Sequence, residues 1–455
     1  MPENPTQIAV TQRLSEFVAA CSWDAIPGQV RHEAIRSLVN FFAVSLAGCN
    51  DPTIAKAARV LGRFRAGEQA TLIGRGERTD LLNAAALNAM SANVFDFDDT
   101  HIPTVMHPTA PVAAALFALA ESTPVSGRQF LHAFVLGVEI ECRIGKAISP
   151  GHYSRGWHIT STCGVFGAAA AAGKVLGLDA QHLAWSFGSA ANQACGLVET
   201  LGTMAKSMSV GNAARNGLLS ALLAREGFDG PAQPLEGVRG FLNVTGERPD
   251  LAGLAGGLGD TWELLSNTYK PYPCGVVLNP VIEACLELHA NRGLDIASID
   301  SIEITGHPLL RQRTDRPAVR TGRESQVSAQ HAAGVVLTTG LAGLEQFSDA
   351  AVAQQAVRDL GSKVCFVDDD SFSLDAARVA VKRADKPALS AWVESASGSL
   401  KRPLTDRALE HKLQTLCAYG RSGCEPGPLI DALWALEASD DVRAILRLAA
   451  GKWKG

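Results

Sequence analysis

Apolar residues recur at helical spacing through most of the first 268 positions of the chain. After Pro27, the segment VRHEAIRSLVNFFAVSLAG carries apolar side chains every three or four residues, which predicts an amphipathic helix that stops near Gly48. The same pattern continues in LLNAAALNAMSANVF, APVAAALFALAES, GRQFLHAFVLGVEIECRIGKAI, STCGVFGAAAAAGKVLGL and NAARNGLLSALLAREGF. Small residues dominate the faces expected to point inward, so these helices should pack closely in an all-α domain.

The pattern changes near residue 270. KPYPCG indicates a proline-rich loop, and the helix PVIEACLELHAN follows it. The alternation in IDSIEITGHP and DAARVAVKR predicts half-buried strands, separated by the helix SAQHAAGVVLTTGLA. We therefore expect a mainly α fold, in which residues 1–268 and 406–455 form a large all-α helical domain and residues 269–405 form a smaller α+β lid domain.

Composition narrows the classes of partner. The 455 residues are 47% hydrophobic and carry a formal net charge of −5, which is typical of a soluble globular protein without a nucleic-acid-binding surface. The longest apolar runs are rich in Gly and Ala and are interrupted by charge, as at Lys174, so no membrane span is expected. The ten cysteines form no CxxC motif, and the N-terminus has no secretory pattern, so a cytoplasmic location is expected.

The stretch FDFDDTHIPTVMHP, residues 95–108, holds three carboxylates and two imidazoles. Asp96, Asp98 and Thr100 match DxDxT, the nucleophile motif of haloacid-dehalogenase-type phosphatases, which makes a Mg-dependent phosphohydrolase using Asp96 and Asp98 one alternative. That motif needs a short strand directly upstream, whereas AAALNAMSANV indicates a helix. A turn after a helix does not offer the octahedral oxygen set that Mg²⁺ prefers. We therefore expect no metal in the site.

A structural interpretation of the same stretch also stays open. Asp98, Asp99 or Thr100 could cap a neighbouring helix, as short polar side chains often do. Capping explains one or two of the acids, but it does not explain both His101 and His107. The stretch is therefore better interpreted as one wall of an acid/base site.

Four basic residues occupy polar loops that precede helices or lie at the expected domain junction. They are His107, His158, Lys206 and Lys270. Helix N-termini favour negative charge, and imidazoles titrate near neutral pH and can act as acid or base. A single such residue is usually structural. Four together are harder to explain as structural residues.

Taken in order, five stretches resemble the MmgE/PrpD family over nearly the whole chain. They are DFDDTHIPTVMHP, GWHITSTCGVFGAAAAAGKVLGL, AKSMSVGNAARNGLLSALLAREGF, YKPYPCG and SAQHAAGVVLTTGLAGLEQFSD. This family includes 2-methylcitrate dehydratases, cis-aconitate decarboxylases and iminodisuccinate epimerases. The resemblance implies a homodimer that needs no cofactor and acts on a small di- or tricarboxylate.

The resemblance also implies roles for individual residues. The expected catalytic residues are Asp96, His107, His158 and Lys206. The expected substrate-binding residues are Thr100, Lys270, Tyr272 and His331. Closure of the smaller domain would bring Lys270, on a loop stiffened by prolines, onto a substrate carboxylate.

Two positions depart from the family pattern. Ser209 and Asn279 stand where many relatives carry histidine, which leaves the substrate and the reaction open. The sequence favours a carbon–oxygen lyase (a hydro-lyase) similar to 2-methylcitrate dehydratase. The alternatives are an epimerase or isomerase, a decarboxylase, and, outside this chemistry, the phosphohydrolase or a non-catalytic helical protein.

Overall fold

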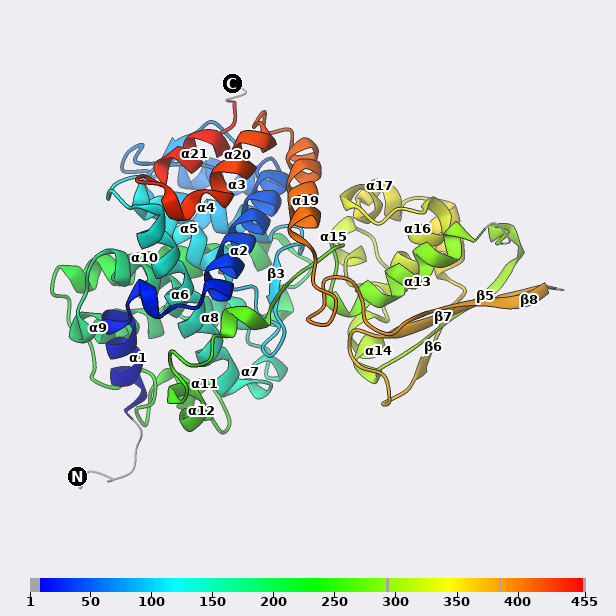
Figure 1. Cartoon of the computed structure of the whole chain (residues 1–455). Coiled ribbons are helices and arrows are strands. Elements are labelled where there is room, and N and C mark those ends of the chain that lie inside the picture. Colours follow the sequence, from blue (N-terminus) through cyan, green and yellow to red (C-terminus); the bar gives the residue numbers. More distant parts are fainter. Residues whose placement is uncertain (1–8, 292–293, 385, 453–455) are drawn as a thin grey trace. The chain divides into compact units, whose positions relative to one another are not determined.

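The computed structural model describes residues 9–291, 294–384 and 386–452, and the chain divides into two compact units (Figure 1). The larger unit holds the chain up to Val94, the segment Asp98–Asn267 and the segment from Asp406 onward. The smaller unit holds Phe95–Phe97 and Thr268–Thr405. Compared with the expected boundaries, the structure moves Phe95–Phe97 and Thr268 to the smaller unit.

The physical reason for the assignment of Phe95–Phe97 is a set of polar contacts within the smaller unit. The side-chain amide of Gln326 donates to the carbonyl oxygen of Phe95 (2.7 Å). The ammonium group of Lys270 donates to the carbonyl oxygen of Asp96 (2.8 Å) and pairs with its carboxylate (3.0 Å).

Helices build the larger unit, which confirms the predicted mainly α fold. Its helices, apart from short 3-10 turns, are α1 (Val10–Ala20), α2 (Gly28–Gly48), α3 (Pro52–Leu61), α4 (Leu81–Asn93), α5 (Thr109–Ala120), α6 (Gly127–Ile148), α7 (Gly151–Ser154), α8 (Ile159–Val175), α9 (Ala180–Ala191), α10 (Met204–Arg225), α11 (Phe241–Thr245), α12 (Leu251–Ala255), α19 (Asp406–Gly420), α20 (Pro426–Trp434) and α21 (Arg443–Ala449). One correction concerns strands. The larger unit also contains the two-residue strands β1 (Ala70–Thr71) and β2 (Arg78–Thr79), which pair antiparallel, and the short strand β3 (Asp99–His101).

Glycines let the central helix α10 approach both α8 and α4 closely. A Cβ atom at Gly217 would lie 2.5 Å from the Cβ of Ala168 on α8, and one at Gly211 would lie 2.7 Å from the carbonyl oxygen of Ala86 on α4. Both distances are far below van der Waals contact. The small residues on the inner faces therefore set how tightly the helices that carry the candidate site pack.

The C-terminal helices complete the larger unit. Helix α19 packs along α2, whose buried face would otherwise be open (Figure 1). The buried ammonium group of Lys412 on α19 donates to the side-chain oxygen of Asn40 on α2 (2.8 Å). At the end of α19, the carbonyl oxygen of Gly420 accepts from the side chain of Asn50 (2.8 Å). Residues some 370 positions apart thus form one helix pair.

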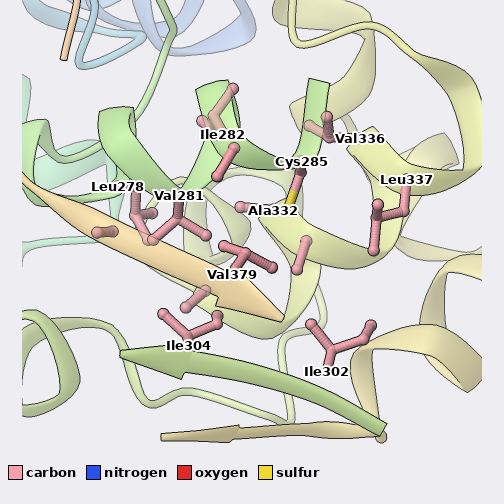
Figure 2. Close-up of a cluster of buried hydrophobic side chains, with 14 of the residues drawn as sticks. Leu278, Val281, Ile282, Cys285, Ile302, Ile304, Ala332, Val336, Leu337 and Val379 are labelled. Atoms are coloured by element: carbon pink, nitrogen blue, oxygen red, sulfur yellow. The ribbon is translucent and has the colours of Figure 1, made fainter. Parts of the chain in front are cut away.

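The smaller unit is a two-layer α/β arrangement. Its elements are β4 (Asn267–Tyr269, at the junction), α13 (Asn279–Ala290), β5 (Ile299–Gly306), α14 (Pro308–Thr314), α15 (Gly322–Ser325), α16 (Ala329–Thr339), α17 (Asp349–Val352), α18 (Gln355–Gly361), β6 (Val364–Asp368), β7 (Ala377–Arg383) and β8 (Lys386–Val393). The strand order is β6-β5-β7-β8, with β5 and β6 parallel and the other neighbours antiparallel. Figure 2 shows part of the core between α13, α16 and the sheet, to which α13 contributes Val281 and Cys285, α16 contributes Ala332, and the strands contribute Ile304 and Val379.

The strands predicted at IDSIEITGHP and DAARVAVKR correspond to β5 and β7, the two central strands. The sequence did not predict β6 and β8, which form the edges of the sheet. Most residues of these two strands are exposed or half-buried, so the alternation of apolar and polar residues is weak. Pro387 is tolerated near the start of β8 because an edge strand can do without one backbone donor.

Among the described residues, every helix is too short or too polar to cross a membrane.

Candidate active site

The segment that follows α4 changes direction sharply before the first candidate histidine. Asp96 and Val105 both adopt positive φ angles, 51° and 56°, which few non-glycine residues do. Helix α4 lies directly upstream of Asp96, as predicted, and the short strand β3 lies downstream. The strand that a DxDxT phosphatase needs before its first aspartate is therefore replaced by a helix, which removes the structural basis for that alternative.

His107 is buried and held at two points. Its backbone N–H donates to Thr160 Oγ1 (3.1 Å), and its Nδ1 lies 2.6 Å from the carbonyl oxygen of Asp99. A carbonyl oxygen can only accept, so Nδ1 carries the proton and the neutral ring has its lone pair on Nε2. The same Nδ1 lies 3.4 Å from Thr100 Oγ1 and 3.6 Å from a carboxylate oxygen of Asp98. The nearby carboxylate stabilises a positively charged imidazolium.

Asp99 caps the next helix. Its carboxylate accepts from the backbone N–H and the hydroxyl of Thr109, the first residue of α5, and from the side-chain amide of Asn267 (2.7 Å). Burial raises the pKa of Asp99 to about 6; the hydrogen bond from Thr109 opposes this rise, and the charge of Asp98 adds to it. Asp99 thus has a structural role at the start of α5, although the N-cap position itself is Pro108, and the backbone carbonyl of Asp99 also orients His107.

His158 stands immediately before α8, at its N-cap position. Its backbone N–H donates to the carbonyl oxygen of Gly196 (3.0 Å), and its Nδ1 lies 2.7 Å from Ser161 Oγ. Ser161 Oγ lies 2.6 Å from Ser209 Oγ on α10, which donates to the carbonyl oxygen of Lys206 (2.8 Å). A continuous chain of hydrogen bonds therefore joins His158 to the first turn of α10.

These contacts bring four of the predicted residues together in the larger unit. Thr100 contacts His107, and Thr160, two residues after His158, holds the backbone of His107. Lys206, the third residue of α10, is buried and is linked to His158 through the two serines. Helix N-termini, two imidazoles and an ammonium group suit the binding of a carboxylate beside an acid/base pair.

The other four predicted residues belong to the smaller unit. Lys270 is buried and pairs with Asp96, as described above. Burial raises the pKa of Tyr272, which packs against the apolar core of that unit. His331 Nε2 donates to the carbonyl oxygen of Gln346 (2.8 Å), and burial lowers the pKa of its imidazole. Their roles with substrate stay predictions.

His101 has a different role from His107, although the two lie in one stretch. Its Nδ1 contacts Thr104 Oγ1 (2.9 Å), and its Nε2 lies 3.2 Å from a carboxylate oxygen of Glu263. The other oxygen of Glu263 accepts from Lys146 (2.7 Å). Burial raises the pKa of Glu263, but hydrogen bonds from His101 and Lys146 outweigh it and lower the pKa to about 2. Burial lowers the pKa of the His101 imidazole, so His101 belongs to a buried hydrogen-bond network with Glu263 and not to the set of contacts around His107.

Sequence reasoning missed Thr160 and Ser161 as contacts of the two histidines. The available signal was their place in the first turn of a helix that follows a histidine, where hydroxyl groups commonly bond to nearby polar groups. Ser209 stood out only as a departure from the family pattern. Its contact with Ser161 depends on how α10 packs on α8, which the sequence pattern does not reveal.

Asp96, Asp98 and His107 are the one group of three among the described residues whose side chains could hold a metal ion. One imidazole and two carboxylates also suit an acid/base site. In addition, the Nδ1 proton of His107 already serves the Asp99 carbonyl. The absence of a metal therefore stays a prediction, tested below.

The structure is that of a mainly helical protein in which two buried histidines stand just before the helices α5 and α8. Two family models match the chain, the MmgE/PrpD N-terminal domain over residues 12–253 and the MmgE/PrpD C-terminal domain over residues 272–426. The chain belongs to the MmgE/PrpD family, which confirms the resemblance of the five stretches in its sequence.

Similar proteins include cis-aconitate decarboxylases. One from Aspergillus terreus is 28% identical over 96% of this chain and 95% of its own length. A cis-aconitate decarboxylase-like protein from Aspergillus oryzae is 29% identical over 97% and 98%. The cis-aconitate decarboxylase of Homo sapiens is 27% identical over 81% and 79%. These relatives are lyases, and they support a lyase-like role for this chain.

Proposed function

We propose that this protein is a lyase that needs no cofactor and decarboxylates a small unsaturated di- or tricarboxylate, with cis-aconitate as the first substrate to test. The observation that carries the proposal is the hydrogen bond from the His107 backbone N–H to Thr160 Oγ1, which ties the segment of buried His107 to the first turn of α8, directly after buried His158. The named activity of the relatives selects decarboxylation ahead of the dehydration that the sequence alone favoured.

The chemistry requires a proton donor and a site for negative charge. In decarboxylation the bond between a carboxylate and its neighbouring carbon breaks, and CO₂ leaves. The electron pair stays on the carbon skeleton and is delocalised through the double bond toward a second carboxylate. A proton from an acid then forms a new C–H bond, and solvent returns a proton to that acid. No oxidation or reduction of a cofactor is needed.

We assign the proton donor to His107. The Asp98 carboxylate, 3.6 Å from Nδ1, and the Asp99 carbonyl both favour its imidazolium form, so Nε2–H is the donor. His158 contacts the Ser161 hydroxyl group at Nδ1, and we assign it as the neutral imidazole of the pair. Lys206 and the starts of α8 and α10 would hold the substrate carboxylates and stabilise the developing charge.

A second candidate reaction uses the same pair. Dehydration of 2-methylcitrate needs a base for the C–H proton and an acid for the leaving hydroxyl group, and a neutral His158 beside a protonated His107 would supply both. In that case His158 acts first. Only the products separate the two reactions.

The test is a product screen on the purified protein. It would be incubated with cis-aconitate, 2-methylcitrate and substituted succinates while CO₂ release, absorbance of new C=C bonds and deuterium entry at carbon are followed. CO₂ from cis-aconitate is expected, at a rate that EDTA leaves unchanged. A C=C signal without CO₂ would favour dehydration, and deuterium entry without net conversion would identify an epimerase. Loss of activity in EDTA that Mg²⁺ restores would overturn the metal-free assignment.

A further inference from the structure

We propose that Ser209 is a positioning residue for His158 and acts through Ser161. The inference rests on the proposed function, and within it on the second candidate reaction, in which a neutral His158 is the base. It adds two residues to that site and states how they work: a pair of hydroxyl groups fixes which nitrogen of His158 is basic.

The direction of the hydrogen-bond chain follows from its far end. A backbone carbonyl can only accept, so the hydroxyl of Ser209 donates to Lys206 O. Each hydroxyl group has one hydrogen, so Ser209 Oγ must accept from Ser161, 2.6 Å away. Ser161 has then used its own hydrogen, and its Oγ accepts from His158 Nδ1–H at 2.7 Å. The proton of neutral His158 is therefore on Nδ1, and the lone pair is on Nε2.

Packing holds this chain in place. Ser161 and His158 are buried, and Gly196 closes over both of them. A Cβ atom at Gly196 would lie 2.7 Å from Ser161 Cβ and 3.4 Å from His158 Cβ, and its φ of 143° suits glycine alone. Ser161 therefore cannot easily turn elsewhere, and for such a buried hydroxyl group an unmade hydrogen bond is costly; Ser209, at the other end of the chain, is half-buried.

Removal of the Ser209 hydroxyl should invert the tautomer of His158. In Ser209→Ala, Ser161 loses its acceptor. The O–H of Ser161 can then donate to Nδ1 of His158 instead. That bond requires the lone pair of the imidazole on Nδ1 and its proton on Nε2. The nitrogen that should serve as base would then be blocked. Because the imidazole stays in place, kcat should fall about 3- to 10-fold, the range of one net hydrogen bond, with KM little changed.

The hydroxyl relay carries no charge, and Ser209→Asp would add one. A carboxylate at this end of the chain should favour the imidazolium form of His158. The limb of the pH–rate profile that reports the basic form of His158 should then move to higher pH. Ser209→Thr keeps the hydroxyl group and should restore the wild-type profile.

The matched control is Ser220, another serine on α10. Its hydroxyl donates to the carbonyl oxygen of Asn216 (2.7 Å) and accepts from the side chain of Gln193 (3.1 Å), with no link to a histidine. Ser220→Ala loses the same chemical group from the same helix. It should change neither the tautomer of His158 nor kcat.

The deciding measurement is ¹⁵N NMR of the full chain labelled at histidine, with the His158 signals assigned by their loss in His158→Gln. Wild type should show a proton-bearing Nδ1 and an unprotonated Nε2, and Ser209→Ala should show the reverse. An unchanged tautomer together with an unchanged pH–rate profile in Ser209→Ala would overturn the inference. The NMR result needs no turnover, so a failure of the proposed reaction is separable from a failure of the relay.

Discussion

Glu263 gives the clearest energetic test of the structure, because its carboxylate joins a buried imidazole to a lysine. Glu263→Gln removes the charge and keeps the shape. The pKa of Glu263 falls from its ordinary value of 4.5 to about 2. At about 1.4 kcal/mol per pH unit, this lowering corresponds to about 3 kcal/mol of stability above pH 4.5.

The net contribution of Glu263 to stability is smaller than this value. Lys146 is about half exposed, so solvent screens its share of the interaction. The hydrogen bond to His101 is not screened in this way, because His101 is fully buried. A hydrogen bond to a charged group contributes roughly 1.5–3 kcal/mol. Glu263→Gln should therefore lower the free energy of unfolding of the larger unit by about 2 kcal/mol at pH 7.

The pH dependence has a definite sign. A carboxylate whose pKa is lowered by folding contributes stability above its unfolded pKa, and the contribution is lost as the pH falls from about 4.5 toward 2. Urea unfolding at pH 7 and at pH 3 measures the difference between wild type and variant. The difference should shrink at pH 3. A difference of equal size at both pH values would refute the electrostatic explanation, as would a loss at pH 7 that Lys146→Met reproduces in full.

Three further predictions concern the proposed chemistry and a buried acid. His107→Gln and His158→Gln should each lower the rate about 10²–10⁴-fold with the fold intact, and the double variant should be scarcely slower. The control is His132→Gln, which should stay active; the imidazole of His132 packs beside Trp23, and burial lowers the pKa of that imidazole to about 4. The reverse result would place the site elsewhere. Lys270→Ala should raise KM strongly and lower kcat, which initial-rate kinetics with a check of thermal unfolding would measure; an unchanged kcat/KM would leave Lys270 with its ion pair alone. Glu141→Gln should stabilise the protein increasingly as the pH rises above about 4.5. Burial holds the pKa of Glu141 well above that value, so the folded state keeps a proton that the unfolded chain releases. Urea midpoints of wild type and variant that change in parallel with pH would contradict this.

Much of the fold could be predicted because several helices begin after a residue that is typical of an N-cap. Asp80, Ser126 and Asp179 each accept a hydrogen bond from a backbone N–H in the first turn of the helix that follows. The central strands β5 and β7 were predictable from alternation, since one of their faces is buried. The edge strands were not, because an edge strand with two partly exposed faces carries little hydrophobic pattern.

For the site, sequence reasoning could find the residues but not their partners. His101 and His107 share one stretch and one side-chain type, yet Glu263, 162 positions after His101, binds that residue in a separate hydrogen-bond network. Thr160 orients the second. Such assignments depend on long-range packing, and local pattern carries no information about which side chain a ring will face.

The helix pair α2–α19 bears on how the chain folds during synthesis. The smaller unit emerges whole from the ribosome before α19 does, because it lies between the two parts of the larger unit. Until Lys412 reaches Asn40, one face of α2 has no partner. Domains generally fold as units during translation. Here the segment made first must wait for the segment made last, so a released chain that ends before residue 406 would leave the side of α2 that α19 covers without its partner helix.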